Sequence, residues 1–153
     1  EDASADRWVA WACVLAPDAT TDWAPVVGAA ERYLAADQTD PGRLQILGGV
    51  LYRAGRYKEA AACLAKADAA RTDLPAQTSS NVYTRLLLAM AMYRAGDRGE
   101  AARVLALAAR EIDGDRSKQP VGWNRRVTLR LLRREAEALV ARPVEVAPSP
   151  RTR

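Results

Sequence analysis

The feature that most constrains this chain is an internal repeat. The run Tyr-Arg-Ala-Gly occurs at residues 52–55 and again at residues 93–96, and in both places Glu-Ala follows after the same interval. Self-similarity of this kind is typical of proteins built from stacked structural repeats. The likeness continues downstream as a small–large–small pattern, at Ala60, Leu64 and Ala67, at Ala101, Leu105 and Ala108, and upstream at Ala29, Tyr33 and Ala36.

The spacing of the repeated residues predicts pairs of helices. Residues at i, i+4 and i+7 lie on one face of a helix, where two small side chains let a neighbouring helix approach around the larger one. Gly55 and Gly96 each follow one helical pattern and precede another, as expected of glycines that end a helix with a positive φ angle. Each copy is therefore predicted to be a helix, a tight turn and a second, antiparallel helix.

Helical patterns cover most of the chain, and no convincing alternation of period two predicts a strand. Seven helices are expected, at residues about 4–16, 22–37, 41–54, 57–71, 78–95, 97–112 and 121–141. Pro17 should end the first helix, and Pro41 should take the first position of the third. The side chains expected to cap helix N-termini are Ser4, Asp22, Asp40 and Asp97, with Thr78, Ser79 or Ser80 for the fifth helix.

The length of 153 residues suits one domain. We expect a single helical repeat domain at residues 1–142, with repeats at about 4–40, 41–75 and 78–113 and a capping helix at 121–141. Residues 143–153 contain three prolines and two arginines and are predicted to form a disordered tail.

The repeated residues resemble the tetratricopeptide repeat (TPR) family, which has a Leu-Gly pair, a turn glycine and an Ala-x3-aromatic-x2-Ala pattern. The best copy has Leu47-Gly48, Gly55, Tyr57, Ala60, Leu64 and Ala67 at these positions. The next copy departs from the pattern at Ala89, which replaces the glycine of the pair, and the first copy matches only in its second helix. The resemblance implies an all-α, right-handed α-solenoid of about three TPR-like helix pairs with a C-terminal capping helix.

Three longer runs, at residues 11–19, 51–60 and 131–139, resemble the C-terminal TPR segments of large planctomycete-type bacterial proteins. Those proteins often carry a serine/threonine kinase domain or WD40 repeats in front of such a segment. The resemblance therefore implies the non-catalytic end of a larger protein. Because the sequence begins with Glu1 and not Met, we also expect it to be a piece of a longer chain.

The chain contains no histidine and only two cysteines. This composition excludes a Ser-His-Asp triad, a Cys-His pair and any zinc site that uses histidine or four cysteines. It also removes the residue that most often acts as a general acid or base near neutral pH. We therefore expect no enzyme activity, no metal and no cofactor, and little change in behaviour between about pH 6 and 8.

In TPR proteins the first helix of each repeat lines a concave groove that binds peptides, so the resemblance implies candidate contact residues. Those residues are Gln45, Tyr52, Arg53, Tyr83, Met90, Tyr93 and Arg94. Two arginine forks beside tyrosines could hold an acidic or extended peptide through charge-assisted hydrogen bonds. The alternative is that the arginines are solvated and the tyrosines serve packing. Gln45 and Gly49 replace the Lys and Asn of the family's carboxylate clamp, which argues against binding of chaperone tails.

The last predicted helix has one apolar and one basic face. Leu129, Leu132, Ala136, Leu139 and Val140 form the apolar stripe, and Arg125, Arg126, Arg130, Arg133 and Arg134 lie opposite it. Residues 124–153 hold eight arginines against three glutamates, whereas residues 1–123 hold 15 basic and 16 acidic residues. A terminal helix with one polar face is what a repeat array needs as a cap, and a basic docking surface is the alternative.

Four tryptophans, Trp8, Trp11, Trp23 and Trp123, fall near the two ends of the array. We expect them to be core residues, with Trp8 and Trp11 packing on the second helix; an exposed tryptophan would mark a docking point. Cys13 and Cys63 lie in apolar surroundings and are expected to be free thiols, which favours a reducing, cytoplasmic location. No run of residues is long and apolar enough to predict a transmembrane helix.

These observations favour a non-catalytic protein–protein interaction or scaffold module that binds a peptide segment or a partner domain on its concave face, with no small-molecule substrate and no membrane. One alternative is an internal regulatory or structural module of a larger kinase-type protein, whose partners are other domains of the parent chain. The other is weak binding of RNA or another acidic polymer through the basic C-terminal helix, which has no recognised nucleic-acid motif to support it.

Overall fold

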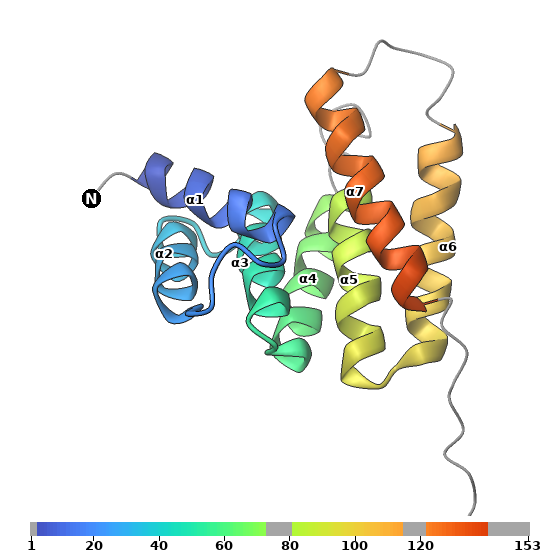
Figure 1. The fold of residues 1–153 in the computed structure, drawn as a ribbon, viewed down its shortest axis with the longest axis horizontal. Helices are drawn as coiled ribbons and strands as arrows, with labels where there is room; N and C mark the ends of the chain where they lie inside the picture. The colour runs from blue at the N-terminus through green and yellow to red at the C-terminus, as the bar shows by residue number, and fades with distance from the viewer. Residues whose placement is uncertain (1–2, 73–80, 115–121, 141–153) are drawn as a thin grey trace, which may run out of the picture.

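The computed structural model describes residues 3–72, 81–114 and 122–140. In these residues the chain forms seven α-helices and no strand, which confirms the predicted all-α class (Figure 1). The helices are α1 (Ala3–Leu15), α2 (Ala24–Ala35), α3 (Pro41–Arg53), α4 (Tyr57–Thr72), α5 (Val82–Ala95), α6 (Arg98–Gly114) and α7 (Trp123–Val140). The predicted tail at 143–153 lies outside the described residues.

Two of the predicted helix caps are confirmed. The Arg43 backbone N–H donates to Asp40 Oδ1 at 2.7 Å at the start of α3, where Pro41 takes the first helical position. The Glu100 backbone N–H donates to Asp97 Oδ1 at 3.2 Å at the start of α6. Each of these bonds satisfies a backbone donor that has no partner within its own helix.

The other predicted caps differ from the structure. Helix α1 begins at Ala3, so Ser4 lies within the helix. Helix α2 begins at Ala24, because Thr20 and Asp22 hydrogen-bond to each other in a local turn; Asp22 Oδ1 accepts from the Ala24 N–H at 3.0 Å from outside the cap position. Helix α5 begins at Val82, and the caps predicted at residues 78–80 lie outside the described residues.

The turns of the two repeated segments have the predicted geometry. Gly55 has a φ of 78° and Gly96 a φ of 102°. Beyond each glycine a backbone N–H reaches back into the preceding helix: Arg56 donates to the Leu51 carbonyl at 2.9 Å, and Asp97 donates to the Met92 carbonyl at 3.0 Å. A residue with a side chain adopts such a positive φ only with strain, which explains glycine at both positions.

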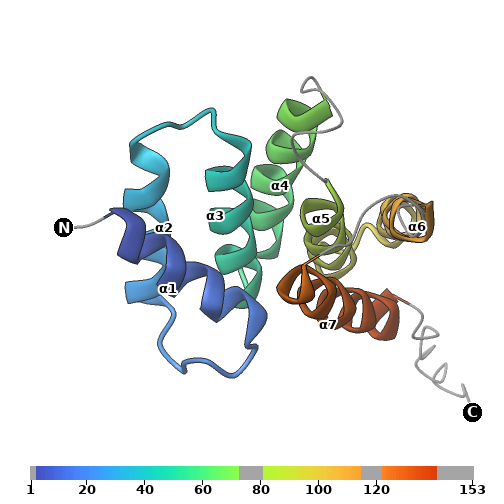
Figure 2. The same cartoon turned by 90° about the horizontal axis from the view of Figure 1, so that it is seen from above.

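Most of the helices pack side by side in a row, and two further helices lie across one side of that row. Helix α3 packs most extensively against α4 and α5 against α6, while α4 also packs against α5. Helices α1 and α7 lie on the same side of this row and contact each other (Figure 2). Helix α7 packs mainly on α5 and less on α6, and α1 packs on α3. Together, α1 and α7 therefore cover the face that α3 and α5 form.

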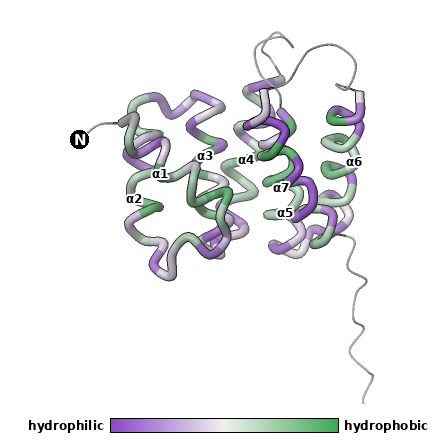
Figure 3. The backbone as a smooth tube through the Cα atoms, turned by 45° about the horizontal axis from the view of Figure 1, so that its top comes forward, coloured by the Kyte–Doolittle hydropathy of each residue, from purple (hydrophilic) through white to green (hydrophobic). Residues whose placement is uncertain are grey.

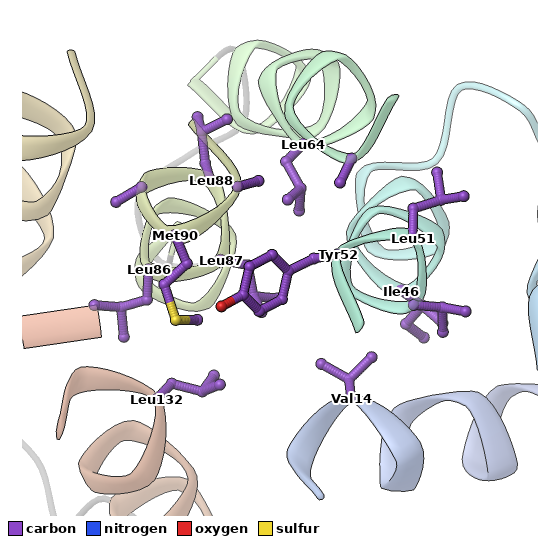
Figure 4. Close-up of a cluster of buried hydrophobic side chains, with 14 of the residues drawn as sticks. Val14, Ile46, Leu51, Tyr52, Leu64, Leu86, Leu87, Leu88, Met90 and Leu132 are labelled. Atoms are coloured by element: carbon purple, nitrogen blue, oxygen red, sulfur yellow. The ribbon is translucent and has the colours of Figure 1, made fainter. Parts of the chain in front are cut away.

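The core lies where this cover meets the row. Figure 4 shows Val14 of α1 and Leu132 of α7 on the same side of a cluster that includes Tyr52 of α3 and Met90 of α5. Hydrophobic segments gather in α3, α4 and α5, whereas α7 alternates between hydrophobic and hydrophilic residues along its length (Figure 3). The buried positions of α7 are Leu132, Ala136 and Leu139, which confirms the central part of its predicted apolar stripe.

Two adjacent glycines allow helices to approach α3 closely. A Cβ atom placed on Gly48 would lie 2.5 Å from Leu64 Cγ of α4, and one on Gly49 would lie 2.9 Å from Val14 Cγ2 of α1. Leu64 and Val14 are completely buried, so a displaced side chain would have to move within the packed core. The Leu-Gly pair of the repeat thus serves close helix packing on two sides of α3.

Replacing Gly48 with alanine should therefore destabilise the fold. Alanine favours a helix by about 1 kcal/mol over glycine, but overpacking a core costs about 1–3 kcal/mol. We expect the free energy of unfolding in urea to fall for Gly48→Ala. The control is Gly99→Ala in α6, where a Cβ atom would meet nothing within 4 Å; this variant should be as stable as the original chain or slightly more stable. Equal effects at the two positions would contradict the packing described for α3 and α4.

Candidate partner-binding site

The side chain of Arg53 connects three helices that are far apart in the sequence. Its Nε donates to the carbonyl oxygen of Val14 at 2.7 Å, and its two Nη groups bind both carboxylate oxygens of Glu135, with Nη2 2.7 Å from Oε2. The Arg53 side chain is only 5% exposed, and its guanidinium lies 5.2 Å from the centre of the Tyr52 ring. Bidentate, charge-assisted bonds of this kind are among the stronger hydrogen bonds in proteins. The guanidinium that we expected to face a partner is thus occupied inside the molecule.

Helices α1 and α7, which Arg53 connects to α3, also bury two more of the predicted contact residues. Tyr52 and Met90 were expected to line an open groove, but both are buried beneath α1 and α7. Burial, followed by the nearby negative charge of Glu135, raises the pKa of Tyr52. In this structure the central part of the α3–α5 face is therefore core and offers no surface to a partner.

Tyr93 and Arg94 have surroundings unlike those of Tyr52 and Arg53, although the sequence makes the two pairs equivalent. Tyr93 is half-buried, with the Arg98 guanidinium 5.4 Å from its ring centre. Arg94 is exposed and lies 6.0 Å from the ring centre of Tyr57. The structure therefore does not gather the seven predicted residues into one groove.

Gln45 and Tyr83, the remaining predicted residues, do meet at one site. They line a pocket of about 400 Å³, to which residues of the first five helices contribute. This volume lies within the usual range of ligand pockets. The described residues that line it are Arg7, Trp8, Trp11, Tyr33, Asp40, Gly42, Gln45, Ile46, Arg71 and Tyr83. We call it the aromatic pocket.

Gln45 places a fixed polar group in this pocket. It is only 7% exposed, and its Oε1 accepts a hydrogen bond of 2.9 Å from the hydroxyl of Thr84, which is completely buried. Its Nε2 has no hydrogen-bond partner among the described residues. An amide N–H₂ group that lines an accessible pocket can donate a hydrogen bond to a ligand.

Aromatic rings form much of the wall. Trp11 and Tyr83 meet edge to face, with ring centres 5.9 Å apart, so this contact connects α1 to α5 in the lining of the pocket. Burial raises the pKa of Tyr83, while the nearby Arg125 acts in the opposite direction. Trp8, with the Arg7 guanidinium 4.8 Å from its ring centre, is 59% exposed and lies where a ligand could cover it.

Among the described residues, the charged groups that line the pocket are Arg7, Arg71 and Asp40. Asp40 already accepts the capping hydrogen bond of α3, so its charge is partly satisfied locally. Burial lowers the pKa of Arg71, while Asp40 and Asp68 act to raise it. The balance of charge in the pocket is basic, which favours a ligand that carries a carboxylate.

The tryptophan predictions are partly wrong. Trp8 and Trp123 are exposed and not core, and Trp11 packs on Tyr83 of α5 in addition to the predicted contacts within the first helix pair. The three-residue spacing of Trp8 and Trp11 was the signal that could have indicated the pocket, because it places both rings on one side of α1. Their contact with α5 depends on how α1 crosses α3, which local spacing does not specify.

Other chemistry is sparse in the part of the chain that the structure describes. Both cysteines are free, and burial raises the pKa of the Cys63 thiol, which donates to the Leu44 carbonyl. The described residues contain no group of three His, Cys, Asp or Glu side chains placed to hold a metal ion. None of the described helices is long and apolar enough to span a membrane.

Comparisons with known proteins found no matching family model, no matching curated protein and no matching solved structure.

Tyr52 and Tyr83 should give the protein a specific sensitivity to alkali. Because folding raises both pKa values, the neutral tyrosines contribute stability that is complete below about pH 10 and is lost as the pH rises through the raised values. We expect the free energy of unfolding to change little between about pH 6 and 8 and to fall above pH 10. For Tyr52→Phe, the free energy of unfolding should fall less steeply as the pH rises above 10. Identical alkaline slopes for the two proteins, measured by urea unfolding, would contradict the burial of this hydroxyl.

Proposed function

We propose that the chain is a non-catalytic protein-interaction module, built as a right-handed solenoid of three TPR-like helix pairs with α7 as the capping helix. The pairs α3–α4 and α5–α6, joined by the same glycine turn, support the repeat architecture. The proposed ligand is a segment of a protein, bound at the end of the concave face that α1 and α7 leave accessible.

The observation that carries this proposal is the combination of Gln45 with an aromatic wall. Thr84 fixes the orientation of the Gln45 amide, so the N–H₂ group is placed to donate to a carbonyl oxygen of the ligand. Every peptide unit has such a carbonyl, and extended segments leave it free. Trp8 and Trp11 supply flat apolar surface at little cost in conformational entropy, which is typical of residues that dominate binding.

The partner segment should therefore have three properties. An aliphatic or aromatic side chain fills the space beside Trp8 and Trp11, a neighbouring backbone carbonyl accepts from Gln45, and an acidic residue lies near Arg7. This chemistry is the same whether the segment belongs to a separate protein or to another part of a parent chain.

A random linear-peptide display library, selected on the immobilised chain, tests the proposal. Selected peptides should share an apolar residue close to an acidic one, and Trp8→Ala should weaken their binding roughly tenfold or more. Gln45→Glu should also weaken it, because the acceptor for Thr84 is kept while the free donor is lost. Val9→Ala is the matched control, since Val9 is an apolar residue of the same helix that is 54% exposed and is not among the residues that line the pocket.

Melting curves followed by circular dichroism will show that the variants are folded. The proposal fails if repeated selections give no common motif, or if the selected peptides bind the Trp8 and Gln45 variants as tightly as the original chain.

A further inference from the structure

Helix α7 presents a row of apolar side chains to the outside. Trp123, Val127 and Leu131 follow one another at intervals of four residues and are all exposed. That spacing places them on one side of the helix, over a length of about 12 Å. Contiguous exposed apolar surface of this kind marks interaction sites more often than isolated exposed residues do.

A row of arginines runs beside it. Arg126, Arg130 and Arg134 each follow one of the apolar residues by three positions, so the two rows are neighbours on the helix surface. All three are exposed, and none has an ion-pair partner among the described residues. We call the two rows together the α7 outer face.

The other arginines on this helix are engaged within the molecule. Arg133 binds Asp113 and Glu137, and these two bonds raise its pKa above the usual range for arginine. Arg125 lies 5.5 Å from the ring centre of Tyr83. Arg133 and Arg125 thus differ from the three arginines beside the exposed apolar row, for which no ion pair with the described residues is seen.

We propose that the α7 outer face binds an amphipathic helix of a partner protein, one that carries an apolar row beside an acidic row. Ridges of side chains spaced by four residues pack against the grooves of a second helix, and carboxylates one turn apart would meet arginines one turn apart. This surface is separate from the aromatic pocket, because none of its residues lines that pocket.

Three other occupants fit less well. A second copy of α7 would place arginine against arginine. Arg134 lies almost in line with Trp123, because eleven residues make about three helical turns. A lipid bilayer that buried Trp123 would therefore have to bury the charge of Arg134 as well, close to the exposed Glu137. RNA would contact the arginines but would leave Val127 and Leu131 uncovered, because aliphatic side chains do not stack on bases as aromatic ones do.

The test uses a display library of alanine-based helices randomised along one face and selected on the whole chain. Selected helices should carry acidic and apolar residues in adjacent rows of four-residue spacing. Arg126→Gln with Arg130→Gln should weaken their binding roughly tenfold or more, and so should Leu131→Asn. The matched control, Lys66→Gln with Arg110→Gln, removes two exposed charges from α4 and α6 and should leave binding unchanged.

Two further probes separate the alternatives. Random single-stranded RNA and vesicles of phosphatidylcholine with phosphatidylserine are titrated against the same variants. The proposal is overturned if no helix is selected, if the selected helices bind the arginine variants as well as the control, or if RNA or vesicles bind the α7 outer face more tightly than the selected helices do. Because the variants of the aromatic pocket differ from these, failure here leaves the proposed function unaffected.

Discussion

The buried guanidinium of Arg53 is the contact on which the arrangement of this molecule depends. It joins the end of α1, the end of α3 and the middle of α7, through the Val14 carbonyl and the Glu135 carboxylate. A charge that is 5% exposed needs such partners, because removing one partner of a buried pair typically costs about 3–5 kcal/mol. These bonds keep α1 and α7 on the α3–α5 face, so the centre of that face becomes core.

Both candidate surfaces follow from this closure. Where α1 and α7 meet over α3 and α5, Tyr52 and Met90 are buried. Beyond that region Trp8 and Trp11 border the aromatic pocket, which Gln45 and Tyr83 also line. Because one side of α7 is used for the cover, its opposite side carries the exposed apolar and arginine rows. The two candidate surfaces therefore differ in shape and chemistry: the aromatic pocket is recessed, and the α7 outer face is the exposed side of a helix.

Several local features of the fold were predictable from the sequence, although the caps expected at Ser4 and Asp22 were wrong, and the long-range contacts were not predictable. Asp40 and Asp97 act as caps, and Gly55 and Gly96 have positive φ, because these roles depend only on neighbouring residues. The apolar stripe of α7 followed from helical periodicity. The partner of Arg53 lies 82 residues away, and nothing in local spacing distinguishes an arginine bound to a carboxylate from a solvated one. For the same reason the burial of Tyr52, Arg53 and Met90 was not predicted: the lining of the groove was inferred without the two helices that cover these residues.

A double-mutant cycle between Arg53 and Glu135 tests the central claim most directly. The free energy of unfolding in urea is measured for the original chain, Arg53→Met, Glu135→Gln and the double variant. If the pair holds α7 over α3, the two single losses will not add, and the coupling energy will be about 1–3 kcal/mol. Losses that add to within about 0.5 kcal/mol would contradict the account, because residues that do not interact behave in that way.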